Sequence, residues 1–160
     1  MKTRIVPGSA VEHLIRKATR SPERYRELIV NTAFLDERGC DLLEDVLIAG
    51  ASTDMRIRYE LGSSAYASAS NFIRDRSILI RSLHSKVYGL VGRSAADDEL
   101  LVTSANLTNG GMETNCETGV RMRASDHELR QVLYKVRDRS MRERVGRGLA
   151  PKRSRKQSKH

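Results

Sequence analysis

A chain of 160 residues is the size of one ordinary domain and can bury a sizeable core, and its composition, 39% hydrophobic and 31% charged, excludes an intrinsically disordered protein. No apolar run approaches the roughly 18–20 residues of a membrane helix, and residues 1–14 lack the apolar segment of a secretory signal, so we expect a cytoplasmic protein without a membrane partner. The net charge of +9 is compatible with a polyanionic partner.

The first half of the chain alternates helix and strand patterns. Ser9 and Glu12 match a capping box, and apolar residues at helical spacing follow it, so we predict an N-terminal helix. The β-rich run at residues 25–35 predicts a buried strand. Residues 36–53 predict a helix, residues 54–61 alternate as a strand does, and the serine-rich residues 62–75 are compatible with helix or loop.

The second half is richer in strands and ends in a helix. We predict strands over residues 76–83, 84–92, 99–107 and 116–122, with a loop over residues 108–115. Ser125 and Glu128 match a second capping box, and Leu129, Val132, Leu133 and Val136 then follow helical spacing. The last residues, KRSRKQSKH, have no apolar side chain to fold around.

This order of elements favours an α/β (α+β) protein in which helices flank a mixed β-sheet. We divide the chain into an N-terminal helical segment over residues 1–20, a main domain over residues 21–148 and a basic disordered tail over residues 149–160. Cys40 and Cys116 lie far apart without the spacing of metal ligands, which predicts free thiols in a reducing compartment. The sequence shows no cluster of His, Cys, Asp or Glu ligands, and we expect no cofactor.

Positive charge is concentrated at the C-terminal end of the sequence. Residues 121–160 hold 14 Lys and Arg but only 4 Asp and Glu, which fits either a solvated basic helix with a tail or a surface for a polyanion. Charge alone does not separate nucleic acid from an anionic membrane. The candidate nucleic-acid-binding residues are Arg121, Arg123, Arg130, Lys135, Arg137, Arg142, Lys152 and Arg153.

Two further segments carry residues suited to phosphate chemistry. Because side chains alternate along a strand, His84 and Lys86 should project to the same side, where the ammonium can bind an anion while the imidazole attacks it. An H-x-K triplet alone is common by chance. Ser104 and Asn106 would add neutral donors for phosphate oxygens, and Glu117 offers a carboxylate that could orient an imidazole.

Together, HSK, TSANLTNGG and NCETGV resemble the motifs of the phospholipase D superfamily, and most closely those of its nuclease branch, across residues 26–123. The resemblance implies a phospholipase D-like sandwich fold and a metal-independent hydrolase that acts on phosphodiester bonds. It implies that His84 forms a phosphohistidine and that Lys86 binds phosphate. Ser104 and Asn106 match the serine and asparagine of G-S-x-N, and Glu117 matches the acidic residue that supports the histidine.

The sequence departs from the family pattern in three places. Thr103 stands where the family has glycine, and the aspartate that many members carry after H-x-K is missing. The chain also holds one copy of the motif, whereas the family's active site uses two histidines, one as nucleophile and one as acid. We therefore expect a twofold homodimer with the site on its axis.

The leading hypothesis is a nuclease, most directly an endonuclease acting on DNA, with specificity supplied by a partner protein if it has any. The alternative is a dimeric DNA-binding module with this fold that lacks turnover. A phospholipid phosphodiesterase is the weaker third option, since aromatic residues make up only 4% and tryptophan, a common interfacial anchor, is absent.

Overall fold

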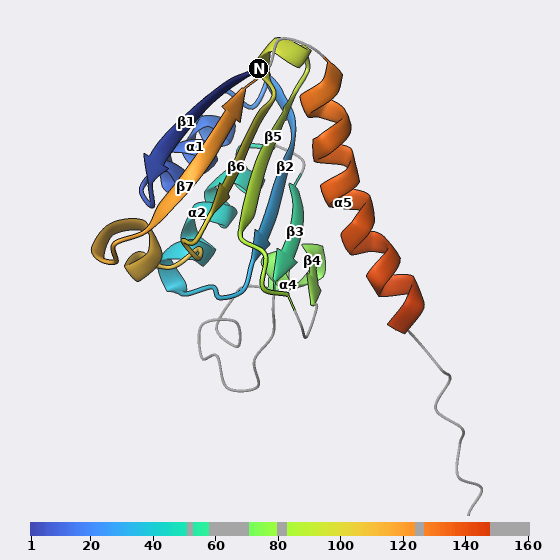
Figure 1. The fold of residues 1–160 in the computed structure, drawn as a ribbon. Helices are drawn as coiled ribbons and strands as arrows, with labels where there is room; N and C mark the ends of the chain where they lie inside the picture. The colour runs from blue at the N-terminus through green and yellow to red at the C-terminus, as the bar shows by residue number, and fades with distance from the viewer. Residues whose placement is uncertain (51–52, 58–70, 80–82, 124–126, 148–160) are drawn as a thin grey trace, which may run out of the picture.

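The computed structural model describes residues 1–50, 53–57, 71–79, 83–123 and 127–147. Within these residues the strands are β1 (Lys2–Pro7), β2 (Tyr25–Thr32), β3 (Thr53–Ile57), β4 (Ser77–Leu79), β5 (Val87–Gly92), β6 (Glu99–Thr103) and β7 (Thr118–Arg123). They form one sheet in the order β1-β7-β6-β5-β2-β3-β4 (Figure 1). Strands β2, β3 and β4 run parallel, and all other neighbours are antiparallel.

Helices cover both faces of this mixed sheet, which confirms the predicted fold class. Helices α1 (Ala10–Arg20) and α2 (Glu37–Ile48) pack on one face, and α5 (His127–Arg147) packs on the other (Figure 1). The short α4 (Asn71–Arg76) lies against α2 and β3. None of the described helices has both the length and the apolar character needed to cross a membrane.

Helix α1 forms the larger core with α2 and the strands beneath them. Its buried residues are the ones that the sequence spacing selects, Val11, Leu14, Ile15 and Ala18, and they pack in one cluster with Tyr88 and Leu90 of β5. The predicted capping box is wrong, because Ser9 is itself in helical conformation and makes no side-chain cap, while Glu12 binds Arg16 and Arg38.

Helix α5 closes the opposite face through a narrow apolar stripe. Leu129 and Leu133 are buried against Ile29, Val91 and Leu100. The prediction that Val132 faces the core is wrong, because its side chain is 39% exposed. Leu129 and Leu133, four residues apart, pack against the sheet, and Val132 lies beside the line that they form on the helix surface. Of the second capping box, Ser125 lies outside the described residues.

Strand β1 was not predicted, because its six residues have a strand partner only when β7 folds beside them. The register runs from Lys2 opposite Arg123 to Pro7 opposite Thr118, so the two strands lie near opposite ends of the domain sequence. The strand predicted from residue 84 begins at Val87. The loop predicted over residues 108–115 contains a π-helix, Gly110–Thr114, closed by the Asn115 N–H to the Gly110 carbonyl at 2.8 Å. The serine-rich residues 62–70 and the tail at 149–160 lie outside the described residues.

The two cysteines are thiols, as expected: Cys40 is buried, which raises its pKa to about 11, and Cys116 is exposed. The helix predicted over residues 36–53 ends at Ile48, and Gly50 follows with a φ of 83°, a conformation that favours glycine.

Candidate active site

Four strand ends meet at one edge of the sheet, where β2 and β6 end and β5 and β7 begin (Figure 1). The predicted site residues lie on the segments at this edge. His84 and Lys86 precede β5, Ser104 and Asn106 follow β6, and Glu117 precedes β7. The segments are joined by backbone hydrogen bonds, from the Thr103 N–H to the Lys86 carbonyl at 3.1 Å and from the Ser104 N–H to the Thr118 carbonyl at 3.0 Å.

The first segment presents its two candidate residues toward solvent. His84 is exposed, and Lys86 is half-buried. The Lys86 ammonium donates to the main-chain carbonyl of His84 at 3.3 Å, so the two residues are in direct contact. This segment lies just before β5, which begins at Val87. The hydrogen bond holds the Lys86 ammonium next to the backbone of His84.

Ser104 and Glu117 are held together by side-chain hydrogen bonds. The Ser104 hydroxyl donates to one carboxylate oxygen of Glu117, and the Asn115 amide donates to the other at 3.5 Å. The Thr118 N–H in turn donates to the Ser104 hydroxyl oxygen at 3.2 Å. The carboxylate of Glu117 thus holds Ser104 in this structure, and its expected support of His84 stays a prediction.

Asn106 is oriented by the segment that follows β2. Its carboxamide oxygen accepts a hydrogen bond from the Phe34 N–H at 3.2 Å. This bond decides which end of the amide is the acceptor. Among the described residues the NH2 group of Asn106 makes no hydrogen bond, so it can donate to an anion.

Buried polar side chains missed by the sequence analysis support the segment that carries Ser104 and Asn106. The Thr32 hydroxyl accepts from the Leu107 N–H at 2.9 Å and donates to the Phe34 carbonyl at 2.8 Å. The Tyr88 hydroxyl donates to the Ala105 carbonyl at 3.1 Å, and burial raises the pKa of Tyr88, which keeps the donor proton in place.

A second support comes from the start of α2. The carboxylate of Asp36 accepts from the Gly39 N–H at 3.0 Å, which caps the helix, and from the Asn109 N–H at 2.6 Å. The guanidinium of Arg38 donates to Asn109 at 2.8 Å and binds Glu113 at 2.6 Å. A helix-capping aspartate is recognisable in sequence, but its bond to Asn109 depends on the tertiary fold.

Glycine at position 111 allows the π-helix to lie against the backbone of Asn106. A Cβ atom at Gly111 would meet the Asn106 carbonyl oxygen at 2.5 Å and the Asn106 nitrogen at 2.8 Å. Both neighbours are main-chain atoms that cannot rotate away. The position of Asn106 therefore depends on this glycine.

Of the predicted nucleic-acid-binding residues, Arg121, Arg123 and Arg130 lie away from this edge, and most of those that the structure describes have partners within the fold. Arg121 and Arg123, at the far end of β7, bind Glu99. Arg130 forms a two-pronged bond to Asp98, with both distances 2.8 Å. Arg137 lies 3.5 Å from Glu27 and 4.7 Å from the ring centre of Tyr134, and Lys135 is exposed. The side chain of Arg142 and all of Lys152 and Arg153 lie outside what the structure describes.

Asp98 and Glu99 anchor this far end of the sheet. Asp98 also accepts from the Gly92 N–H at 2.8 Å, so its bond to Arg130 ties α5 to the turn between β5 and β6. Burial favours a higher pKa for Glu99, but hydrogen bonds from Arg121 and Lys17 outweigh it, and the pKa is lowered. In the described residues, no group of three or more His, Cys, Asp or Glu side chains could hold a metal ion.

No family model and no curated protein sequence match the chain. Among solved structures, it is similar to a polyphosphate kinase from Porphyromonas gingivalis (TM-score 0.62, 16% identity), with 86% of this chain covering 26% of that one. It is also similar to Nuc, a phospholipase D family member from Salmonella typhimurium (TM-score 0.57, 17% identity), with 88% of this chain covering 93% of that one. A third similar structure is TrmBL2, an archaeal chromatin protein (TM-score 0.50, 16% identity), with 89% of this chain covering 53% of that one. These likenesses show that the chain has a phospholipase D-like fold.

Proposed function

We propose that this protein is a metal-independent phosphodiesterase that cleaves nucleic acid, with DNA as its substrate, through a covalent phosphohistidine. One observation carries the proposal: three segments distant in sequence bring the H-x-K pair, Ser104 with Asn106, and Glu117 to one sheet edge. The fold shared with Nuc supports it, since Nuc is a phospholipase D family member and its whole length is nearly covered by this chain.

The reaction divides into two displacements at phosphorus. In the first, an imidazole nitrogen of His84 forms a bond to phosphorus while the bond to the leaving oxygen breaks, and that oxygen takes a proton from His84 of the partner subunit. In the second, water forms the new bond to phosphorus, the phosphorus–nitrogen bond breaks, and the partner subunit's His84 accepts the water proton. Atoms and charge balance without a further reactant.

The other site residues stabilise charge in this scheme. The Lys86 ammonium and the amide NH2 of Asn106 bind the non-bridging oxygens, where negative charge gathers in the transition state. Glu117 keeps Ser104 in place through their hydrogen bond, which joins the Ser104 segment to the segment before β7. Supporting side chains behind these residues limit their movement, which fast phosphoryl transfer requires.

A homodimer is part of the proposal, because one chain supplies one motif. Next to the site, on the face of the sheet that carries α5, an aliphatic row crosses three paired strands: Ile5, Val120 and Val102 are 84%, 38% and 42% exposed. A second copy of the chain that covers this row would bury these side chains and place its own site edge nearby.

A cleavage assay in excess EDTA tests the chemistry. The wild type should cleave linear DNA and the small diester bis(4-nitrophenyl) phosphate, whereas His84→Ala should cleave neither. Mixed oligomers test the shared site. Because the site on the axis needs His84 from both subunits, an excess of the His84→Ala chain should lower the activity of the wild-type chain as mixed dimers form. EDTA-sensitive cleavage, or equal rates for wild type and His84→Ala, would contradict the proposal.

The second candidate is a DNA-binding module that has no turnover, favoured by the structural likeness to TrmBL2, which is described as a DNA-binding chromatin protein. The two candidates differ in what His84 does. In a binding module, the wild type would retain DNA without cutting it, and His84→Ala would leave the affinity unchanged. A gel retardation assay run beside the cleavage assay separates them.

A further inference from the structure

The end of the sheet opposite the candidate active site carries a cluster of cations on the face that packs against α1. Lys2 pairs with Arg123 across β1 and β7, and Arg4 pairs with Arg121. All four lie on the same face, since they are two residues apart on paired strands. The last turn of α1 adds two more. We name this set the basic edge; it consists of Lys2, Arg4, Lys17, Arg20, Arg121 and Arg123.

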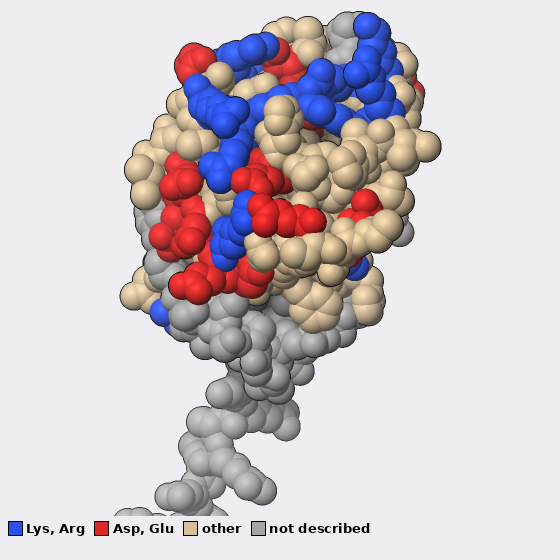
Figure 2. Space-filling view, turned by 90° about the vertical axis from the view of Figure 1, so that its left-hand side faces the viewer, with Lys and Arg blue, Asp and Glu red and all other residues tan. Residues whose placement is uncertain are grey.

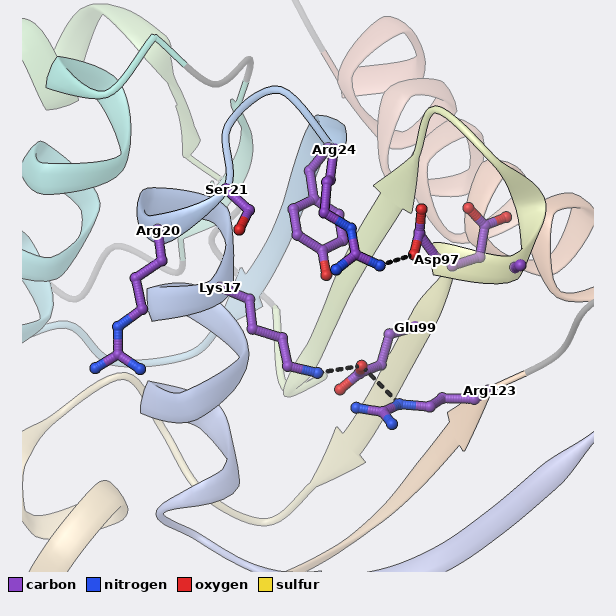
Figure 3. Close-up of a pocket in the computed structure, with 10 residues that line it drawn as sticks. Lys17, Arg20, Ser21, Arg24, Asp97, Glu99 and Arg123 are labelled. Atoms are coloured by element: carbon purple, nitrogen blue, oxygen red, sulfur yellow. Dashed lines mark hydrogen bonds and ion pairs between the residues drawn. The ribbon is translucent and has the colours of Figure 1, made fainter.

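The carboxylates that bind these six cations are too few to neutralise their charge. Glu99, only 3% exposed, binds Lys17 and Arg123, each at 2.8 Å (Figure 3). It also binds Arg121. Three cations therefore share one carboxylate. The shortage shows at Arg121, where Nη2 is buried and has no hydrogen-bond partner among the described residues. Within that part of the chain, no carboxylate pairs with Lys2, Arg4 or Arg20.

Directly paired like charges destabilise a sheet, so this arrangement costs folding free energy that a bound anion would offset. The surplus of positive charge acts on its neighbours as well. Burial lowers the pKa of His13, and Lys17 and Arg121 lower it further. Burial also lowers the pKa of Lys17, with Arg121 and Arg123 acting in the same direction against the bond to Glu99.

The shape of the surface indicates an extended ligand. Two hollows open on it. The cations that line the larger one, of about 370 Å³, are Lys17, Arg20, Arg24 and Arg123, and its carboxylates, Asp97, Asp98 and Glu99, are all bound to basic side chains. The smaller one, of about 160 Å³, is lined by Lys2, Arg4, Arg121 and Arg123. Arg123 lines both, so the two hollows lie next to each other. Figure 2 shows basic side chains gathered at this end of the molecule and acidic ones toward the other end. A chain of phosphates fits a continuous row of cations better than one small anion does.

We propose that the basic edge binds the phosphate backbone of nucleic acid at a distance from the cleavage site. This inference rests on the proposed function for its choice of nucleic acid as the partner. A membrane surface is less well matched, because the exposed Ile5 points to the other face of β1, away from these cations. The basic edge contacts phosphates rather than bases, so binding is independent of sequence and sensitive to salt.

The test measures the affinity of the full chain for a labelled 30-base-pair duplex between 50 and 300 mM salt, in a His84→Ala background that prevents cleavage. Lys2→Gln combined with Arg4→Gln removes two cations whose side chains make no hydrogen bond or ion pair among the described residues. We expect about tenfold or greater loss of affinity at low salt, and a slope of log K against log salt that is smaller by about 2, or 0.9 for each lost phosphate contact.

A matched control removes two cations elsewhere, by Arg26→Gln combined with Arg74→Gln. Both of these side chains are exposed and lie on other elements. The control should keep the parent affinity and slope. An equal loss in both pairs would show that binding follows net charge alone, and an unchanged affinity in the Lys2/Arg4 pair would show that the surface is not used; either result overturns the inference.

Two further measurements separate this inference from the proposed function. Hydrolysis of bis(4-nitrophenyl) phosphate by the wild type reports the chemistry alone, so its absence together with edge-dependent DNA binding would reject the enzyme and retain the basic edge. Flotation with phosphatidylserine vesicles tests the membrane. Vesicle binding lost in the Lys2/Arg4 pair, with DNA affinity unchanged, would assign the surface to lipid and overturn the inference.

Discussion

The two ends of the sheet are built in contrasting ways. At the site end, neutral groups and backbone amides do most of the positioning: Thr32, Tyr88 and the Phe34 N–H hold the segment that carries Asn106. At the far end, the carboxylates of Asp98 and Glu99, 0% and 3% exposed, hold three arginines and a lysine. The site end fixes polar residues by hydrogen bonds and leaves His84 exposed, and the far end buries two carboxylates that bind basic side chains.

The contrast assigns separate tasks to the two ends. Buried ion pairs are expensive to break, so the far end should govern the stability of the fold. Hydrogen bonds around the partly exposed site residues position them at modest cost, so the site end should govern activity. A change at either end should therefore affect one property much more than the other.

His84→Ala should give the largest effect on activity, a loss of at least about 10³-fold in hydrolysis of a small phosphodiester, because the nucleophile is removed. The exposed side chain makes little contribution to packing, so thermal unfolding should stay within a few degrees of wild type. His13→Ala, an exposed histidine on α1, is the control and should hydrolyse at the parent rate. A comparable loss in both variants would contradict the assignment.

Asp98→Asn should give the largest effect on stability. It leaves Arg130 buried without its counter-charge, and breaking a buried pair of this kind lowers the free energy of unfolding by about 3–5 kcal/mol. Urea denaturation measures the loss. Asp97→Asn, whose partner Arg24 is mostly exposed, should cost much less. If the neighbouring variants proved equally stable, the far end would not be the anchor described above.

Gly111→Ala should lower activity by displacing Asn106, since the substitution leaves every predicted site residue in the chain. The added methyl group displaces the backbone of Asn106, with an expected loss of about 10- to 100-fold in activity and about 1–3 kcal/mol in stability. Gly110→Ala is the matched control, because its Cβ would meet its nearest neighbour, the amide of Asn115, at 3.4 Å. Similar activities in the two variants would show that Asn106 is not positioned by this contact.

Glu99→Gln should remove a pH-dependent part of the stability, of about 1–3 kcal/mol. The pKa of Glu99 is lowered in the folded chain, so its contribution is complete above the ordinary carboxylate pKa and is lost as pH falls through the folded value. Wild type and variant should differ most near pH 7 and converge under acidic conditions. Urea midpoints at pH 7, 5, 4 and 3 measure this, and a constant difference would contradict it.

Ser104→Ala should give the smallest effect of the set. It removes the hydroxyl that donates to Glu117, a bond worth about 0.5–1.5 kcal/mol, so we expect a decrease in activity of about 2- to 10-fold. Turnover numbers for the small diester measure it. A loss as large as that of His84→Ala would mean that Ser104 takes part in the reaction itself rather than holding Glu117.

The sequence predicted the elements whose signal is local. The apolar spacing of α1 and the continuous apolar run of β2 were read correctly, because burial of one helix face or of both strand faces imposes those patterns. It failed where pairing is non-local: β1 has no strong pattern of its own and exists through β7. Val132 was misassigned because the width of the stripe under α5 is set by the sheet.

For the site, the motif spacing indicated the residues that carry chemistry but not what holds them. Thr32, within an apolar strand, and Arg38, on a helix, match no motif, since their roles depend on segments about 75 positions away, as the bond from Leu107 to Thr32 shows. Arg121, Arg123 and Arg130 were predicted to bind nucleic acid, a prediction that stays untested, and in the fold they also bind carboxylates. Sequence does not show that Asp98 and Glu99 lie buried beside them.

The pairing of β1 with β7 has a consequence for synthesis on the ribosome. Residues 2–7 emerge long before residues 118–123, so the first strand of the chain waits for its partner until most of the domain has been made. Contacts this distant in sequence slow folding and leave an unpaired strand available to other molecules. A nascent chain that stalls before β7 would lack both the strand that joins β1 to β6 and the site residue Glu117. It should be a target for chaperones or proteases.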